Sequence, residues 1–193
     1  MLILDRNTLP ANSNYLDADV AYVLIYLSDK AYASRSDLSN YLCIGEGRFR
    51  GLLSIMVDAG LVSIHRKGVC LTENGRKLYG SMGIRPIDID IGFVLGTFTQ
   101  GVKVFGKASK IRTGIEQVKI STAYGGVGCT TWVMERGAIN LPPHLNFTLS
   151  NVQDSQLIMD EADMHNGDVY LVCGAESLRA ARVAAMMVAL DLV

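Results

Sequence analysis

The sequence has 193 residues, of which 49% are hydrophobic, and its 18 basic and 19 acidic side chains give a net charge of −1. This length and apolar content exclude a disordered chain and suit one domain of about 100 to 150 residues with a smaller one beside it. The near-neutral charge excludes nucleic-acid binding through overall basicity, so binding of that kind has to come from a local surface.

The chain carries no pattern of a membrane or secreted protein. No run approaches the ~18 uncharged apolar residues of a membrane span, and Asp5 and Arg6 precede any signal-like apolar core. We therefore expect a cytoplasmic protein without a membrane partner.

The cysteines are scattered along the sequence with no close pair. Such spacing argues against a disulfide framework and against a zinc site, so we expect buried thiols. The four are Cys43, Cys70, Cys129 and Cys173.

The composition changes near residue 83. The segment Met82-Gly83-Ile84-Arg85-Pro86 combines a helix-ending glycine with a proline, which disfavours helix in the residue before it. We therefore predict a domain boundary there, with one domain at 1–82 and another at 83–193. The first domain has nine basic and eight acidic residues, and the second has nine basic and eleven acidic residues. The first domain therefore has a positive net charge, as a nucleic-acid-binding domain needs.

Helix and strand patterns follow one another along the first domain. Two aspartates suit the N-terminus of a strongly apolar first helix, and Ser36 suits the N-cap of a second. A tight turn leads into a third helix, which Gly60 ends, and Thr72 is expected to cap a closing helix. The predicted helices are 17–27, 36–43, 47–59 and 73–82, and two short strands at 61–65 and 69–72 form a hairpin.

The third helix has one apolar face and one open face. Phe49, Leu52, Leu53 and Met56 recur at the spacing of a single helical stripe, which we expect to be buried. The opposite face is left free to bind. It carries Gly47, Arg50, Gly51, Ser54 and Asp58, with Arg48 beside it.

This order of elements is that of the winged form of the helix-turn-helix. Residues 17–82 resemble the winged-helix domains of bacterial and archaeal transcription regulators. The resemblance lies in Ile44-Gly45-Glu46-Gly47-Arg48-Phe49-Arg50-Gly51-Leu52-Leu53, in Asp58-Ala59-Gly60-Leu61-Val62 and in Leu71-Thr72-Glu73-Asn74-Gly75-Arg76.

The third helix is the candidate for the DNA major groove, which is about 12 Å wide and admits one helix. The predicted readers of base edges are Glu46, Arg48 and Arg50, because side chains near the helix N-terminus reach the groove floor. Ser54, one turn later, is expected to touch the DNA backbone. The alternative for each arginine is an ordinary solvated side chain.

The predicted hairpin has a basic tip. Arg66 and Lys67 lie between its strands, where they are expected to hold phosphates or enter the minor groove. The alternative is an ordinary hydrophilic turn. His65 is interpreted as a surface residue at the end of a strand.

The second domain mixes strands and helices. Strands are predicted at 91–98, 129–134 and 168–173, and helices at 114–124, 154–161 and 176–192. The last strand is apolar at nearly every position, which fits a strand covered on both faces. The predicted fold class is therefore α+β, with an N-terminal winged helix-turn-helix followed by a C-terminal mixed α/β layered domain.

One strand-to-helix junction in this domain is a candidate ligand site. Gly174, Ala175, Glu176 and Ser177 present backbone N–H groups at a helix N-terminus, where open α/β sheets hold anionic ligands. The alternative is that Glu176 itself satisfies the helix end. The glycine-dense run at 125–131 precedes a strand and no lysine follows it, so it is not a phosphate-binding P-loop.

Catalytic and metal-binding patterns do not stand out. No nucleophile or paired-carboxylate arrangement accompanies His65, His144 or His165, so we predict no catalytic residue and no enzyme. The acidic residues around His165 are interpreted as a solvated loop rather than a metal site, and no cofactor is predicted.

The second domain contains further recognisable sequence motifs. It includes Gly114-Ile115-Glu116-Gln117, the small-residue run at 125–131, Leu141-Pro142, and Gly167-Asp168-Val169-Tyr170-Leu171-Val172 before an Ala-rich helix. With these segments, the whole chain resembles a family of small archaeal proteins in which a winged helix precedes a domain of unknown function.

Together these patterns predict a one-component transcription regulator that binds double-stranded DNA. A homodimer would set two recognition helices about one DNA turn apart. The second domain would then sense a small-molecule effector or form the dimer. Two other interpretations stay open, namely a metabolite-binding α/β enzyme domain with an appended winged helix, and a protein-interaction module.

Overall fold

The computed structural model describes residues 15–143 and 145–193. Asp5, Arg6 and His144, on which expectations above depend, lie outside the described residues. The chain divides into two compact units, Met1–Met82 and Gly83–Val193. Helices combined with separate antiparallel sheets make the fold α+β.

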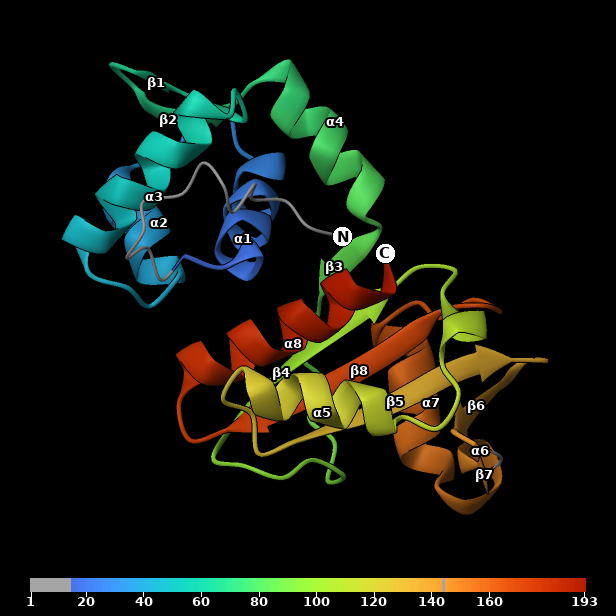
Figure 1. Cartoon of the computed structure of the whole chain (residues 1–193). Helices are drawn as coiled ribbons and strands as arrows, with labels where there is room; N and C mark the ends of the chain where they lie inside the picture. Colours follow the sequence, from blue (N-terminus) through green and yellow to red (C-terminus); the bar gives the residue numbers. More distant parts are fainter. Residues whose placement is uncertain (1–14, 144) are drawn as a thin grey trace. The chain divides into compact units, whose positions relative to one another are not determined.

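From residue 15 onward, the first unit contains four helices and one β-hairpin (Figure 1). In chain order they are α1 (Asp17–Ser28), α2 (Arg35–Tyr41), α3 (Glu46–Asp58), β1 (Val62–His65), β2 (Gly68–Leu71) and α4 (Glu73–Met82). This is the predicted order of three helices, a hairpin and a closing helix, with slightly different bounds.

The N-cap of α2 is Ser34, and the prediction of Ser36 is wrong. The Ser34 hydroxyl accepts a hydrogen bond from the Asp37 backbone N–H at 3.0 Å, and the Asp37 carboxylate accepts one from the Ser34 N–H at 3.3 Å. This reciprocal pair satisfies two otherwise unpaired backbone donors. It requires an acidic side chain three residues after the cap, and Ser36 has Ser39 at that position.

The predicted apolar stripe of α3 is confirmed as core. Phe49, Leu52, Leu53 and Met56 are all buried. Thr72 caps α4 as predicted, because its hydroxyl accepts a hydrogen bond of 3.1 Å from the backbone N–H three residues later. The capped helix packs against α1. Burial of the stripe therefore determines which face of α3 stays at the surface.

The hairpin is held against the segment that precedes α2. Ala33 and Val69 exchange two backbone hydrogen bonds of 2.9 Å and form an isolated β-bridge. Gly68 allows this approach, because a Cβ there would lie 2.5 Å from the Ala33 carbonyl oxygen. Its φ of +133° is also one that residues with a side chain rarely adopt. The bridge thus fixes where the hairpin lies relative to the start of α2.

Gly68→Ala is expected to loosen this bridge, because the added Cβ meets backbone and the φ strains any side chain by about 1 to 3 kcal/mol. Amide hydrogen exchange at Ala33 and Val69 is expected to accelerate about tenfold. The control is Gly80→Ala on α4, where nothing lies within 4 Å of the added Cβ. Equal exchange in the two variants would contradict the role assigned to Gly68.

Residues 83–143 and 145–193 form the second unit, built on a six-stranded antiparallel sheet with the order β3-β4-β8-β5-β6-β7 (Figure 1). The strands are β3 (Ile84–Pro86), β4 (Phe98–Val104), β5 (Gly128–Glu135), β6 (Ala138–Leu141), β7 (Leu145–Asn146) and β8 (Val169–Ala175). The helices are the 3₁₀ helix η1 (Ala108–Lys110), α5 (Ile115–Ala123), α6 (Phe147–Ser150), α7 (Val152–Glu161) and α8 (Leu178–Leu192). Across the described parts of the chain, every helix is too short or too polar to span a bilayer.

Helices cover both faces of this sheet. α5 and α8 lie together on one face, against β4, β5 and β8, and α7 lies on the other (Figure 1). Since successive residues of a strand point to opposite faces, Trp132, Tyr170 and Val172 pack with Phe147 and Ile158 on the α7 side. The central strand β8 is buried at every position, which confirms the predicted strand with two covered faces.

The predicted strand at 91–98 is wrong. The strand begins at Phe98, and residues 87–97 form an irregular segment whose Ile89 and Val94 pack on the core of the α7 side. The apolar residues of this segment cover the sheet rather than join it. Gly96 has a φ of +117°, which interrupts extended backbone just before β4.

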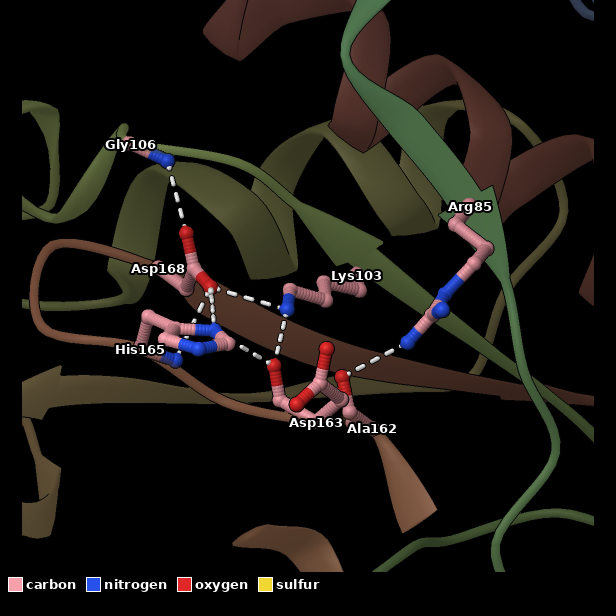
Figure 2. A network of polar contacts seen from close by, with 7 residues as sticks. All are labelled: Arg85, Lys103, Gly106, Ala162, Asp163, His165 and Asp168. Carbon is pink, nitrogen blue, oxygen red and sulfur yellow. Dashed lines mark hydrogen bonds and ion pairs between the residues drawn. The ribbon is translucent and has the colours of Figure 1, made fainter. Parts of the chain in front are cut away.

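A buried ion pair joins β4 to the turn before β8 (Figure 2). The Lys103 side chain is 0% exposed, and its Nζ lies 2.9 Å from Oδ2 of Asp168. Nζ also donates a hydrogen bond to the carbonyl oxygen of Asp163. The Asp168 carboxylate accepts hydrogen bonds from the backbone N–H groups of Gly106 at 2.9 Å and His165 at 3.0 Å. Both buried charges are therefore hydrogen-bonded as well as paired, which offsets the cost of removing them from water.

Candidate nucleic-acid interface

The four predicted contact residues of α3 are all exposed. Glu46, Arg50 and Ser54 follow one another at intervals of four residues, so they lie along one line of the helix surface. This row begins at the helix N-terminus, the end from which winged-helix side chains reach base edges. It offers, in order, a carboxylate acceptor, a guanidinium donor and a hydroxyl.

Arg48 points to a different side of α3. It precedes Arg50 by two residues, which turns its side chain by about 200° around the helix. Its guanidinium lies 4.0 Å from the carboxylate of Asp19 in α1 and 6.0 Å from the ring centre of Tyr15. Since the Asp19 side chain is 0% exposed, a DNA contact by Arg48 would compete with a buried carboxylate.

The hairpin tip consists of the two predicted cations. His65 pairs with Gly68 at the end of the β1–β2 ladder, so Arg66 and Lys67 alone form the turn, and both are exposed. His65 is exposed at the strand end, with its Nε2 3.0 Å from the hydroxyl of Ser63.

Arg35, the first residue of α2, lies between the row on α3 and the hairpin tip. It lines a hollow of about 80 Å³ together with Glu46 and Arg50. It also lines a hollow of about 310 Å³ together with Arg66 and Lys67. The Ala33–Val69 bridge explains this position, because it holds the start of α2 beside the hairpin. We refer to Arg35, Arg50, Arg66 and Lys67 as the basic face.

The basic face is locally positive in a chain of near-neutral net charge. Its four cations are exposed, and Glu46 is the carboxylate that lines a hollow with two of them. Within residues 15–143 and 145–193, none of the four takes part in an ion pair. Their charge is thus available to an anionic partner.

Sequence reasoning missed two residues of this surface. Arg35 lies outside the turn and third helix in which DNA contacts were predicted, and the Ala33–Val69 bridge places it beside the hairpin tip. Tyr15 lies against Gly51 of α3, because a Cβ there would clash with the Tyr15 hydroxyl, so the expectation that this face is free is wrong at Gly51. An isolated glycine inside a helical pattern is a signal of such close approach and could have indicated a covering group there.

At the predicted ligand junction 174–177, Gly174 and Ala175 are buried, whereas Glu176 and Ser177 are exposed. A Cβ on Gly174 would clash with the carbonyl of Leu95, so the segment before β4 lies directly against it. The Ser177 hydroxyl caps α8 by accepting a hydrogen bond of 3.2 Å from the backbone N–H three residues later. Glu176 accepts one of 3.4 Å from the hydroxyl of Thr97.

Two open, polar hollows of the second unit share Arg112. One has a volume of about 450 Å³ and is also lined by Lys110 and Gln117, and the other has a volume of about 610 Å³ and is also lined by Arg136 and Asn140. Carboxylates line these hollows as well, Glu116 and Asp191 in the first and Glu135 in the second, so each one mixes both signs of charge. In the part of the chain that the structure describes, no three His, Cys, Asp or Glu side chains gather as metal ligands.

Two hypothetical proteins of known structure align with this chain over different lengths. A hypothetical protein from Pyrococcus horikoshii OT3 aligns over 92% of this chain and 92% of its own, with a TM-score of 0.70 and 22% sequence identity. This similarity shows a shared fold. A hypothetical protein from Sulfolobus solfataricus aligns over 34% of this chain and 52% of its own, with a TM-score of 0.31 and 19% identity. No curated protein matches the sequence.

A family model matches nearly the whole of the second unit. The match covers residues 95–192, which include the chain from the start of β4 to the end of α8. The family is described as a domain of unknown function (DUF4443), in agreement with the expected domain of unknown function behind the first 82 residues. Because the match spans half of the sequence, the chain belongs to the DUF4443 family.

Proposed function

We propose that the chain is a DNA-binding transcription regulator of the winged-helix type, with α3 in the major groove and the hairpin on the phosphate backbone. The observation that carries this proposal is the basic face. Its cations come from α2, α3 and the hairpin tip and are all exposed. Arg35 lines one hollow with Arg50 and a second hollow with Arg66 and Lys67. Such a face concentrates positive potential where a DNA backbone would bind.

The row on α3 supplies the base contacts in this proposal. Arg50 can donate two hydrogen bonds to a guanine, and Glu46 can accept one from the amino group of a cytosine. Ser54, one turn along, contacts a phosphate or sugar. Arg35, Arg66 and Lys67 hold phosphates on either side and set the register of the helix in the groove.

Arg48 has a smaller role in this arrangement. Its guanidinium already faces the buried carboxylate of Asp19, so a base contact would leave that carboxylate without this cation. We therefore expect Arg48→Ala to change DNA affinity less than Arg50→Ala.

The second unit serves as the dimerisation or effector domain of the regulator. A two-fold dimer would present two α3 helices about 34 Å apart, one turn of DNA, and would double the number of phosphate contacts. The hollows beside Arg112, which cations and carboxylates line together, are where a small polar effector would bind.

The test of DNA binding is selection of bound duplexes from a random pool with the purified full-length protein. We expect an enriched sequence with two-fold symmetry, because a homodimer reads two half-sites. A protein that is monomeric by light scattering and enriches no sequence at ~50 mM salt would overturn the proposal.

Arg50→Ala is expected to weaken binding to the enriched sequence by about 1 to 3 kcal/mol, which is about five- to 150-fold, and to relax the preference at one base pair. Fluorescence anisotropy with the selected duplex and single-base variants measures both effects. Lys77→Ala is the matched control, because Lys77 is an exposed cation of the same unit but lies on α4, 2.7 Å from Glu73. Equal affinities of the two variants would remove Arg50 from the interface.

A further inference from the structure

Cys129 and Cys173 face each other directly across β5 and β8, although the sequence keeps them far apart. Opposed residues of an antiparallel pair have Cα atoms about 4.5 to 5.5 Å apart, depending on the ladder position. A disulfide spans Cα separations of about 4.4 to 6.8 Å. All four cysteines are thiols, and the expectation that they are buried is wrong for Cys43, which is exposed, whereas Cys173 is buried. Distance along the chain gave no sign that Cys129 and Cys173 are opposed across two strands.

The two side chains lie on the same face of the sheet. Trp132 and Tyr170 point to the α7 side, so the alternation of strand residues directs Cys129 and Cys173 toward α5 and α8. Cys173 is 0% exposed, whereas Cys129 is half-buried. The sulfur of Cys129 lies 3.8 Å from the hydroxyl of Thr131.

We propose that Cys129 and Cys173 form a modification site, a reactive dithiol that exchanges with small-molecule disulfides and closes into a reversible disulfide between β5 and β8. Cys129 is the attacking thiol and Cys173 the resolving one. Neither residue belongs to the DNA-binding surface, so this proposal does not depend on the proposed function.

The environment of each sulfur supports this order of reaction. The hydrogen bond from Cys173 lowers the pKa of the Cys129 thiol, and the Thr131 hydroxyl adds to it against the opposing effect of burial. The hydrogen bond to Cys129 and burial raise the pKa of Cys173. Since the thiolate is the nucleophile, the half-buried Cys129 reacts first with a reagent from solvent.

The reaction balances with one disulfide molecule as oxidant. Cys129 loses its proton to solvent and its thiolate attacks one sulfur of the reagent; the reagent's S–S bond breaks, and the other sulfur leaves as a thiolate that takes a proton from solvent. Cys173 then loses its proton to solvent and attacks the Cys129 sulfur of the mixed disulfide, whose S–S bond breaks, and the second reagent thiolate leaves and takes a proton from solvent. The protein loses two electrons and two protons, and the reagent disulfide is reduced to two thiols.

The test exposes the native full-length protein to hydroxyethyl disulfide, quenches with acid, alkylates remaining thiols and maps the peptides by mass spectrometry. We expect a cross-linked pair of peptides containing Cys129 and Cys173, which dithiothreitol converts back to two thiols. Cys43 is the internal reference, because it is exposed. If Cys129 and Cys173 are both still alkylated as thiols when Cys43 has fully reacted, the proposal is wrong.

Two variants test the order of attack. Cys173→Ser is expected to trap the reagent as a mixed disulfide on Cys129, and Cys129→Ser is expected to leave Cys173 unmodified. Fluorescence of the buried Trp132, the single tryptophan of the sequence, verifies that each variant is folded. Modification of Cys173 in folded Cys129→Ser at the wild-type rate would overturn the assignment of Cys129 as the attacking thiol.

Discussion

Removal of both cations of the hairpin tip, by Arg66→Ala with Lys67→Ala, is expected to weaken binding to every duplex DNA sequence. Each phosphate contact contributes about 0.9 to the slope of log affinity against log salt, so the slope should fall by about 1 to 2. At ~0.15 M salt, loss of two such contacts corresponds to about thirtyfold in affinity. A salt series followed by fluorescence anisotropy measures both quantities.

The loss should be equal for different sequences, because phosphates are the same at every base pair. This separates the hairpin tip from Arg50, whose removal should affect the selected sequence most. Lys77→Ala, which removes an exposed cation on α4, should leave the slope unchanged. If the double variant keeps the wild-type salt slope, the hairpin lies outside the DNA interface. If it loses affinity for one DNA sequence only, the hairpin contacts bases rather than phosphates.

Asp168→Asn is expected to destabilise the second unit by about 3 to 5 kcal/mol, because it leaves the fully buried charge of Lys103 without its partner. The new amide would also direct N–H donors toward backbone N–H groups that now donate to the carboxylate. Urea unfolding followed by Trp132 fluorescence reports on this unit, since Trp132 is buried in β5.

Two further variants distinguish the ion pair from a general effect of the turn. His165→Ala keeps the backbone N–H that donates to Asp168, so it should cost less than about 1 kcal/mol. In a protein that already carries Lys103→Met, Asp168→Asn should cost much less than in the wild type, because no buried charge is left unpaired. Additive losses in the double variant would contradict the coupling of the two charges.

The same carboxylate makes the stability of the second unit depend on acid pH. Burial raises the pKa of Asp168, but the hydrogen bonds from Lys103, Gly106 and His165 outweigh it and lower the pKa. Since the folded-state pKa lies below the unfolded value of about 3.9, this contribution is complete above that value and is lost as the pH falls through the folded-state pKa. The difference in unfolding free energy between wild type and Asp168→Asn should therefore be constant near neutrality and shrink below about pH 4.

The elements of the first unit could be predicted because their signals lie within a few residues of one another. The stripe from Phe49 to Met56 has helical spacing, and Thr72 stands directly before the helix that it caps. The cap of α2 was misplaced because Ser34 and Ser36 are alike until the acidic partner three residues later is considered.

Prediction failed where one local pattern fits two environments. The run at 91–98 is apolar enough for a strand, but its side chains cover the sheet instead. The adjacent strand β4 is less apolar in sequence, because it contains Gln100 and Lys103, which are both buried. A buried lysine gives no signal in sequence, because its partner Asp168 stands far along the chain. Pairing with β8 decides that residues 98–104, and not residues 91–97, form the strand.

Hydrophobic period and helix caps act between near neighbours, so the order of residues was enough to predict the helices of the first unit, the buried face of α3 and a central strand covered on both sides. Which distant residues meet is visible only in the folded molecule. The Ala33–Val69 bridge brings Arg35 to the hairpin, and the β5–β8 register sets Cys129 against Cys173. These contacts depend on strand register and on packing between separate segments, and no local pattern along the chain specifies either.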